Sequence, residues 1–159
     1  MNANRKAFLN MIAYAEGADP NHPLSKDRGY DVIVTGSDGP EIFTDYRAHP
    51  FANGRKAKHI TGSLYSSASG RYQFMRVHWA HYRDQLKLPD FGPESQDRWA
   101  IQLIRERGAL PDIDAGHFRV AVGKVSNIWA SLPGAGYGQP ERKFTALETA
   151  YEASGGTFA

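Results

Sequence analysis

Hydrophobic residues near the start of the chain recur with the spacing of an α-helix, and one acidic residue falls among them. Leu9, Ile12 and Glu16 lie at i, i+3 and i+7, which places them on one side of a helix. The pattern predicts a helix over residues 4–15 that Gly17 ends. An acid on the apolar side of a helix is unusual, so Glu16 is the first candidate for a functional residue.

The pattern changes to short strands after a loop segment, rich in turn residues, at 19–29. The β-branched residues 32–34 and a second apolar run at 42–46 flank turn residues at 36–40. This arrangement predicts a β-hairpin, to which a third strand could add. Residues 50–62 show no clear period and are predicted to form a loop.

The rest of the chain repeats its apolar residues every three or four positions, which predicts further helices. Pro93 and Pro140 suit the first turns of two of them, and Gly108 is placed to end one. We therefore predict an α+β fold in a single domain over residues 1–159, with the strands at roughly 29–62 and helices in the remainder. The apolar positions of the predicted helices are Tyr72, Met75, Trp79, Tyr82 and Leu86; Trp99, Leu103 and Ile104; Phe118, Val122, Val125 and Trp129; and Phe144, Leu147 and Tyr151.

The composition is that of an ordinary globular protein. The 159 residues are 41% hydrophobic and 23% charged, which is enough for one domain with its own core. The absence of cysteine excludes disulfides and thiolate metal sites. The formal net charge is +2. The sequence contains no run of five like charges, which argues against nucleic acid as a partner. No segment approaches the ~20 apolar residues that cross a bilayer, and Asn10 interrupts the N-terminal apolar run, so we predict neither membrane insertion nor a signal peptide.

Two physical effects would raise the pKa of Glu16 on the predicted helix. Burial beside Leu9 and Ile12 disfavours the charged form, and so does the negative end of the helix dipole. A carboxylic acid that keeps its proton near neutral pH can act as a general acid. The alternative is a half-exposed glutamate on the last turn that has no part in chemistry.

Other patterns point away from metal and nucleotide chemistry. His78 and His81 are three residues apart with no acid between them, so we predict no metal site. The glycines of "PGAGYGQP" lack the spacing of a dinucleotide-binding loop, and we predict no cofactor. Tyr30, Tyr46 and Tyr137 lie in predicted loops or at strand ends, where their flat rings could stack on sugars.

Six segments, in order along nearly the whole chain, carry a family resemblance. They are "RKAFLNMIAYAEG", "GYDVIV", "FTDY", "GRYQ", "ERGALP" and "SNIWASLPGAGYGQ". They resemble the lysozyme (endolysin) family of bacteriophage lambda and its relatives. The resemblance implies a lysozyme-like fold, with a cleft between a small β-sheet lobe and a larger helical lobe. It also implies a lytic transglycosylase that cleaves the β-1,4 bond between N-acetylmuramic acid (MurNAc) and N-acetylglucosamine (GlcNAc) of peptidoglycan without water, leaving a 1,6-anhydro-MurNAc end.

The resemblance also implies roles for individual residues. Glu16 falls on the family's single catalytic acid, and Gln73 falls on a residue that faces this acid in the wider lysozyme-like superfamily. Asp31 and Asp45 are rival carboxylates; we assign Asp31 to sugar binding or lobe positioning and Asp45 to a strand-end hydrogen bond. Lys124 stands where the family leads us to expect arginine, and a lysine keeps the charge but loses the planar fork. The residues expected to bind the glycan are Tyr30, Asp31, Tyr72, Gln73, Lys124, Asn127 and Tyr137.

Two other functions stay open at this point. Glu16 and an aspartate together would make a hydrolytic muramidase, because glycoside hydrolysis normally uses two carboxylates. A fold that binds sugar without catalysis would be a glycan-binding module. By family analogy, the enzyme would be made in the host cytoplasm and would need a separate holin to reach the periplasmic cell wall and lyse the host. We expect a monomer whose partner is the peptidoglycan glycan strand.

Overall fold

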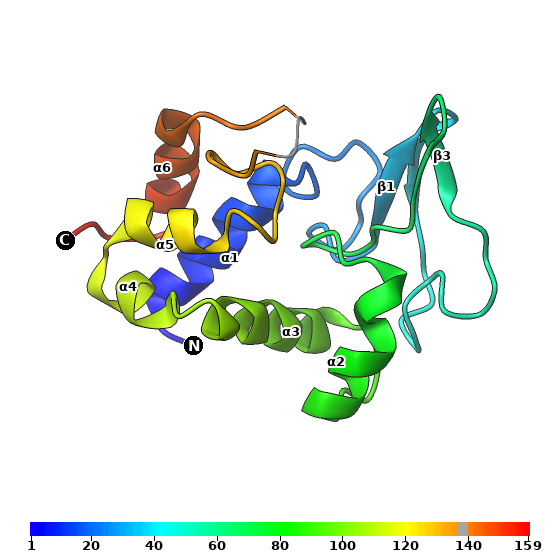
Figure 1. Ribbon diagram of the computed structural model, residues 1–159, viewed down its shortest axis with the longest axis horizontal. Coiled ribbons are helices and arrows are strands. Elements are labelled where there is room, and N and C mark those ends of the chain that lie inside the picture. The colour runs from blue at the N-terminus through cyan, green and yellow to red at the C-terminus, as the bar shows by residue number, and fades with distance from the viewer. Residues whose placement is uncertain (137–139) are drawn as a thin grey trace. The chain divides into compact units, whose positions relative to one another are not determined.

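The computed structural model describes residues 1–136 and 140–159, and these residues form two compact units (Figure 1). The first unit comprises Met1–Glu16 and Ala100–Ala159, and the second comprises Gly17–Trp99. The chain therefore passes from one unit to the other directly after Glu16 and again after Trp99. None of the described helices is long and apolar enough to cross a membrane.

The predicted first helix is confirmed, and its ends follow from the local sequence. Helix α1 spans Ala3–Ala15. At its start, the Asn2 side chain accepts a hydrogen bond of 2.9 Å from the backbone N–H of Arg5, which is a typical N-cap. At its end, Gly17 has a φ of +73°, which glycine adopts without steric cost. The buried residues of α1 are Ala7, Phe8, Leu9, Met11, Ile12, Ala13 and Ala15.

The described part of the first unit contains three more whole helices and the end of another. These are α4 (Leu110–Ala115), α5 (Phe118–Val125) and α6 (Phe144–Ala153), together with the C-terminal half of α3 (Pro93–Glu106). Helix α1 packs against both α4 and α6. The core of this unit includes Leu147 and Tyr151 of α6, as the spacing predicts.

Two of the predicted helices have different limits from those expected. Helix α6 begins at Phe144 and not at Pro140, because the backbone N–H of Arg142 donates to Ser131 O at 2.7 Å and Lys143 is extended. Helix α5 ends at Val125, and Trp129 is buried beyond its end.

The second unit carries all the described strands, in two antiparallel pairs. Strand β1 (Val32–Gly36) pairs with β2 (Gly39–Ile42) as the predicted hairpin, with Val32 opposite Ile42. Strand β3 (Lys58–Thr61) pairs with β4 (Leu64–Ser66). The prediction of a loop over residues 50–62 is therefore wrong at its end, because these two strands are too short to show an alternating pattern.

The second predicted strand, over residues 42–46, is wrong in position, because β2 lies earlier in the chain. Residues Phe43, Thr44 and Tyr46 lie beyond the end of β2. Phe43 is buried instead, with its ring centroid 6.0 Å from that of Phe91 and 5.4 Å from that of Tyr46. Aromatic packing explains the apolar run in this segment without a strand.

The helix predicted to begin near Tyr72 starts later. Helix α2 spans Trp79–Leu86 and follows the 3₁₀ turn η1 (Arg76–His78). Tyr72 is fully buried in the turn before it, whereas Met75 is 39% exposed. The four-residue spacing from Met75 to Trp79 therefore does not mark a helix. The ring that faces inward in this turn is that of Phe74, which stacks on Trp99 with centroids 3.9 Å apart.

Candidate active site

Glu16 continues the apolar side of α1 by one residue past its end. Its backbone N–H donates to Ile12 O at 2.9 Å, and its φ and ψ of −81° and −1° are still near helical values. The side chain therefore follows Leu9 and Ile12, which are 3% and 0% exposed. Glu16 itself is half-buried.

Burial raises the pKa of Glu16 from its ordinary 4.5 to about 7. The Ser131 hydroxyl and the positive charge of Arg142 act in the opposite direction, since each favours the carboxylate. The predicted direction of the shift and its cause in burial are confirmed. At neutral pH both forms of the side chain are present in comparable amounts, so Glu16 can give a proton and take one back.

Two residues from later in the first unit, Arg142 and Ser131, lie at the end of α1. The Nε of Arg142 donates to Ala15 O at 3.2 Å, and its guanidinium carbon lies 5.4 Å from the centroid of the Tyr14 ring. The buried Oγ of Ser131 makes no hydrogen bond of standard geometry to a described residue, so its contact with Glu16 is weaker than a full hydrogen bond.

Other acids of the first unit form ion pairs with cationic side chains of the described residues. Asp112 accepts from Lys124 Nζ at 2.6 Å, and Asp114 pairs with Arg5 at 2.7 Å. Glu141 accepts instead from backbone, with Gly134 N at 3.2 Å and Gly136 N at 3.3 Å from its two carboxylate oxygens.

The two rival aspartates lie in the second unit and differ from Glu16 in their surroundings. Asp45 is exposed and forms a forked ion pair with Arg47, whose hydrogen bonds lower the pKa of Asp45 to about 2. Asp31 is 4% exposed and accepts hydrogen bonds from Ser25 Oγ at 2.6 Å and Lys26 N at 2.9 Å. Asp31 thus fixes the loop that precedes β1, and Asp45 bonds to its near neighbour Arg47.

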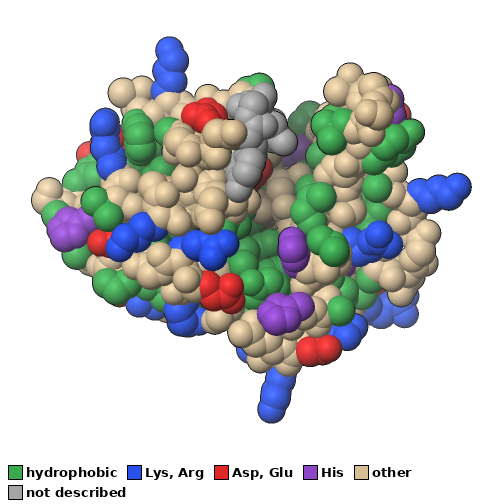
Figure 2. Space-filling model, in the orientation of Figure 1, with side chains coloured by type: hydrophobic (Ala, Val, Ile, Leu, Met, Phe, Trp, Pro, Cys, Tyr) green, Lys and Arg blue, Asp and Glu red, His purple; other side chains and the backbone are tan. Residues whose placement is uncertain are grey.

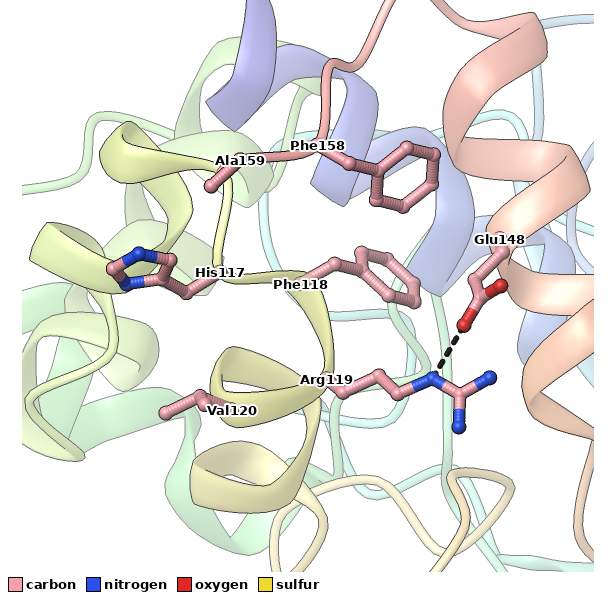
Figure 3. A pocket seen from close by; sticks show the side chains of 8 residues that line it. His117, Phe118, Arg119, Val120, Glu148, Phe158 and Ala159 are labelled. Atoms are coloured by element: carbon pink, nitrogen blue, oxygen red, sulfur yellow. Dashed lines mark hydrogen bonds and ion pairs between the residues drawn. The ribbon is translucent and has the colours of Figure 1, made fainter.

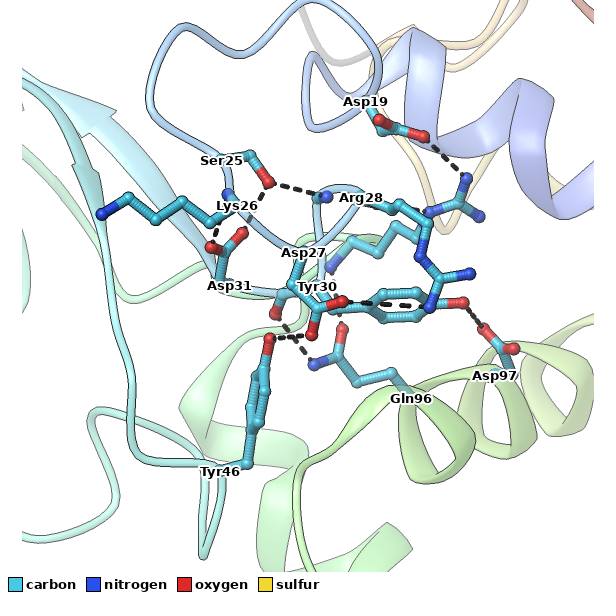
Figure 4. A network of polar contacts seen from close by, with 12 residues as sticks. Asp19, Ser25, Lys26, Asp27, Arg28, Tyr30, Asp31, Tyr46, Gln96 and Asp97 are labelled. Carbon is cyan, nitrogen blue, oxygen red and sulfur yellow. Dashed lines mark hydrogen bonds and ion pairs between the residues drawn. The ribbon is translucent and has the colours of Figure 1, made fainter.

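A polar network in the second unit surrounds Tyr30 (Figure 4), and Tyr72 shares its partner Asp97. Both hydroxyls donate to Asp97 Oδ1, Tyr30 at 2.9 Å and Tyr72 at 2.5 Å. Arg71 is 6% exposed, and its Nη2 pairs with Asp19 at 3.0 Å. The ring of Tyr30 is 6% exposed, with the guanidinium carbon of Arg71 5.2 Å from its centroid. These contacts give both tyrosines a structural role, and their contact with sugar stays a prediction.

Gln73 has a backbone conformation that is rare for its residue type. Its φ is +54°, in the left-handed region, and its Nε2 donates to Gly70 O at 2.9 Å. The structure thus places Gln73 in a tight turn and not at the start of a helix. A strained backbone at a non-glycine residue is found often at functional sites.

The remaining predicted binding residues belong to the first unit. Lys124 Nζ bonds to Asp112 at 2.6 Å and to Gly108 O at 3.4 Å, so its charge joins α5 to α4. Asn127 is exposed, and its Oδ1 accepts from Arg107 Nε at 3.2 Å. Tyr137 lies outside the described residues. Glycan binding by Lys124 and Asn127 stays a prediction.

Four residues that build these surroundings are not among those predicted from the sequence. Arg71 and Ser131 lie inside two of the quoted segments, "GRYQ" and "SNIWASLPGAGYGQ", which could have singled them out. No sequence signal marks Arg142 or Asp97, because their partners lie far away in the chain: 127 residues separate Arg142 from Ala15.

Neither of two open hollows on the described surface includes Glu16 in its lining. One, of about 580 Å³, is formed by residues of the segment 42–55, including Asp45 and Arg47. The other, of about 370 Å³, lies in the first unit, where Arg119 Nε donates to Glu148 at 2.6 Å (Figure 3).

The described residues form no cluster of metal ligands, and the face shown in Figure 2 carries no concentration of positive charge. They contain no cluster of three or more His, Cys, Asp or Glu side chains that could hold a metal ion. His49 is buried, with Nε2 bonded to Phe74 O at 2.7 Å, and burial lowers its pKa to about 4. On the face shown in Figure 2, Lys and Arg side chains are scattered and do not form one patch.

Comparison with known proteins identifies relatives along nearly the whole chain. Residues 6–158 match the family model described as Endolysin. The chain is 61% identical over 155 residues to the endolysin of Escherichia phage P2, which covers 96% of this chain and 93% of that protein. It is 50% identical over 157 residues to the endolysin of Escherichia phage lambda, covering 99% of this chain and 94% of that one.

Solved structures agree with these relatives. A structure of bacteriophage lambda lysozyme complexed with a chitohexasaccharide matches with a TM-score of 0.92 at 50% identity, covering 100% of this chain and 98% of that chain. A second structure, of lysozyme from bacteriophage lambda, matches with a TM-score of 0.87 at 48% identity and the same coverage. The predicted α+β lysozyme-like fold and the family resemblance are confirmed.

Proposed function

The chain belongs to the Endolysin family of lysozyme-like, peptidoglycan-degrading enzymes, and we propose that it is a lytic transglycosylase with Glu16 as its single catalytic carboxyl group. On this proposal, the enzyme cleaves the β-1,4 bond between MurNAc and GlcNAc and leaves a 1,6-anhydro-MurNAc end. The observation that supports it is the half-buried carboxyl of Glu16, whose pKa burial raises to about 7.

The proposed reaction uses Glu16 twice. The protonated carboxyl first donates to the glycosidic oxygen as the bond from that oxygen to C1 of MurNAc breaks. The 6-hydroxyl oxygen of the same MurNAc then bonds to C1, and the Glu16 carboxylate takes the hydroxyl proton. The products are a 1,6-anhydro-MurNAc end and a GlcNAc with a free 4-hydroxyl. Glu16 ends protonated, as it began, and no water is consumed.

A single carboxyl group suffices for this reaction, and the rival aspartates are poor candidates for a second. Hydrolysis would need a partner carboxylate ~5–5.5 Å away to act as nucleophile, or ~6.5–9.5 Å away to activate water. Asp45 is held by Arg47, and Asp31 is buried with its oxygens bonded to Ser25 and Lys26. These hydrogen bonds and this ion pair support transglycosylation over hydrolysis by a muramidase.

We further propose that the substrate is a glycan strand of alternating β-1,4-linked N-acetyl sugars. The lambda lysozyme structure that this chain matches contains a chitohexasaccharide, which supports this class of ligand. Gln73 is the second-unit residue that best fits sugar binding, because its Nε2 is fixed on Gly70 O and its amide oxygen can accept from a hydroxyl.

The cellular context proposed here follows the family. The enzyme would act as a monomer on the periplasmic cell wall, after synthesis in the host cytoplasm and release by a separate holin. Induction in bacterial cells with and without a holin gene tests this: lysis is expected only when both are present. Lysis without any holin would contradict the proposed route.

The mass of the muropeptides separates the two enzymatic mechanisms. Digestion of purified peptidoglycan should yield fragments one water lighter than those of a hydrolytic muramidase. Reducing MurNAc ends as the main product would refute the transglycosylase proposal. The Glu16→Gln variant should lose this activity, whereas Glu152→Gln, an exposed acid on α6, should keep it. An active Glu16→Gln variant would remove Glu16 from the mechanism.

A further inference from the structure

We propose that Arg142 is a positioning residue for Glu16: it holds the last carbonyl of α1 and places a positive charge beside the carboxyl group. The proposal deepens the proposed function and rests on it, because it assigns a partner to the same acid. It concerns only residues of the first unit.

Three contacts from separate groups fix Arg142. Its backbone N–H donates to Ser131 O at 2.7 Å, and its Nε donates to Ala15 O at 3.2 Å. Its guanidinium carbon lies 5.4 Å from the centroid of the Tyr14 ring, within the range of a cation–π contact. A long side chain with both ends attached in this way has lost most of its rotational freedom, so its charge stays at one place.

The end of α1 lacks what Arg142 supplies. The last carbonyl groups of a helix have no partners inside the helix, and the negative end of its dipole favours a cation. The last turn of α1 contains no basic residue. Arg142 comes from 126 positions beyond Glu16 in the chain and provides the missing donor at Ala15 O.

Three acids on the helices that pack against α1 have their own partners, and a fourth, Glu152 of α6, is exposed. On α4, Asp112 pairs with Lys124 and Asp114 with Arg5; on α6, Glu148 pairs with Arg119. Arg5 is eleven residues from Glu16 on the same helix, or ~16 Å along its axis, which is beyond a Debye length at physiological salt.

The charge of Arg142 matters for the carboxylate form of Glu16, which arises when Glu16 donates its proton in the proposed reaction. Once Glu16 has given up its proton, its carboxylate must persist until it takes the proton of the 6-hydroxyl. Burial disfavours this form, and Arg142 offsets part of that effect. Without Arg142 we expect Glu16 to become a weaker acid, because its carboxylate is less stabilised, and its proton transfer to the glycosidic oxygen to slow.

The test measures the titration of the Glu16 carboxyl carbon by NMR, which needs no activity. In Arg142→Gln we expect the pKa of Glu16 to rise by about 0.5–1 relative to wild type. The matched control is Lys143→Gln, which removes the same charge from the next residue, an exposed side chain at the start of α6; it should leave the pKa within about 0.2. Equal shifts in the two variants would overturn the proposal.

Two further measurements keep the test decisive if Arg142→Gln folds poorly. Arg142→Lys keeps the charge but loses the Nε donor and the planar stack, so the pKa should stay within about 0.3 of wild type. In the wild-type protein, raising the salt concentration from about 0.05 M to about 0.5 M should raise the pKa of Glu16, because Arg142 is exposed and its charge is screened. A Glu16 pKa that is independent of salt would count against the proposal.

Activity measurements separate this proposal from the proposed function. In Arg142→Gln the alkaline limb of the pH–activity profile should move by the same amount as the NMR titration, with kcat reduced and KM little changed. An NMR shift with no change in activity would support the placement of Arg142 and contradict the role of Glu16. An inactive Glu16→Gln variant with an unshifted titration in Arg142→Gln would support the role of Glu16 and contradict the placement of Arg142.

Discussion

At the scale of the residue, Glu16 is placed where its charge is costly to the fold. The side chain follows Leu9 and Ile12 on the buried side of α1, and burial raises its pKa from 4.5 to about 7. A raised pKa in the folded state means that the protein binds the proton more tightly folded than unfolded. The stability that protonated Glu16 contributes is therefore fully present below pH 4.5, and it is lost as the pH rises through about 7. Ionised Glu16, the group proposed for catalysis, should thus lower the unfolding free energy of the protein above neutral pH.

The Glu16→Gln variant should accordingly be more stable than wild type at pH 8. One pKa unit corresponds to about 1.4 kcal/mol, so we expect a gain of about 2–3 kcal/mol, or roughly 5–10 °C in the unfolding temperature. At pH 4 the two proteins should unfold at nearly the same temperature, because Glu16 is then mostly protonated in both the folded and the unfolded protein. Thermal unfolding at the two pH values checks this, with Glu152→Gln as a control expected to show little difference at either. A destabilised Glu16→Gln at pH 8 would mean that the carboxylate is favoured in the fold.

At the scale of the element, the turn before η1 depends on a glycine whose replacement by any other residue should be costly. Gly70 has a φ of +84°, and a Cβ there would lie 3.1 Å from the Phe91 ring and would overlap the Gln96 amide. Gln96 is buried; its Oε1 accepts from Arg71 N at 2.8 Å, and its Nε2 donates to Tyr30 O at 3.0 Å. Any movement of Gln96 would therefore disturb the polar network of the second unit.

The Gly70→Ala variant should lose about 3 kcal/mol of unfolding free energy, from the left-handed backbone and from displacement of Gln96. Gly134→Ala is the matched control, because Gly134 has nearly the same φ, +86°, and no atom of the described residues lies within 4 Å of the position of its Cβ. It should lose only about 1 kcal/mol, the cost of the backbone conformation alone. Urea unfolding of both variants measures the difference. Equal losses would show that Gln96 moves freely and that the network is not rigid.

These elements also show what sequence patterns can predict. Helix α1 was predictable because its apolar stripe and the glycine after it are local signals. The helix expected from Tyr72 was not, since Tyr72 and Phe74 owe their burial to Asp97 and Trp99 from another element. Glu16 stood out as an acid within an apolar stripe, whereas its neighbour Arg142 carries no local signal.

At the scale of the whole molecule, binding and chemistry should be separable. Glu16 is proposed to give and take a proton, while residues from other parts of the chain, such as Gln73 and Asn127, are predicted to hold the sugar. If so, removing the acid leaves the binding surface intact. A glycan-binding module without catalysis makes a different prediction, because in such a protein Glu16 has no special part in cell lysis.

The Glu16→Gln variant should therefore still bind a chito-oligosaccharide of six sugars, and binding should stabilise it. A ligand at 100 times its Kd adds about 2.7 kcal/mol to the unfolding free energy, which is roughly 5–10 °C for a chain of this size. The unfolding temperature of Glu16→Gln should rise with ligand concentration, while the variant releases no product from peptidoglycan. Maltohexaose, whose sugars lack N-acetyl groups, is the control and should not raise it. A variant that neither binds nor cleaves would mean that Glu16 holds the glycan itself, and its proton would then no longer be needed to explain the loss of activity.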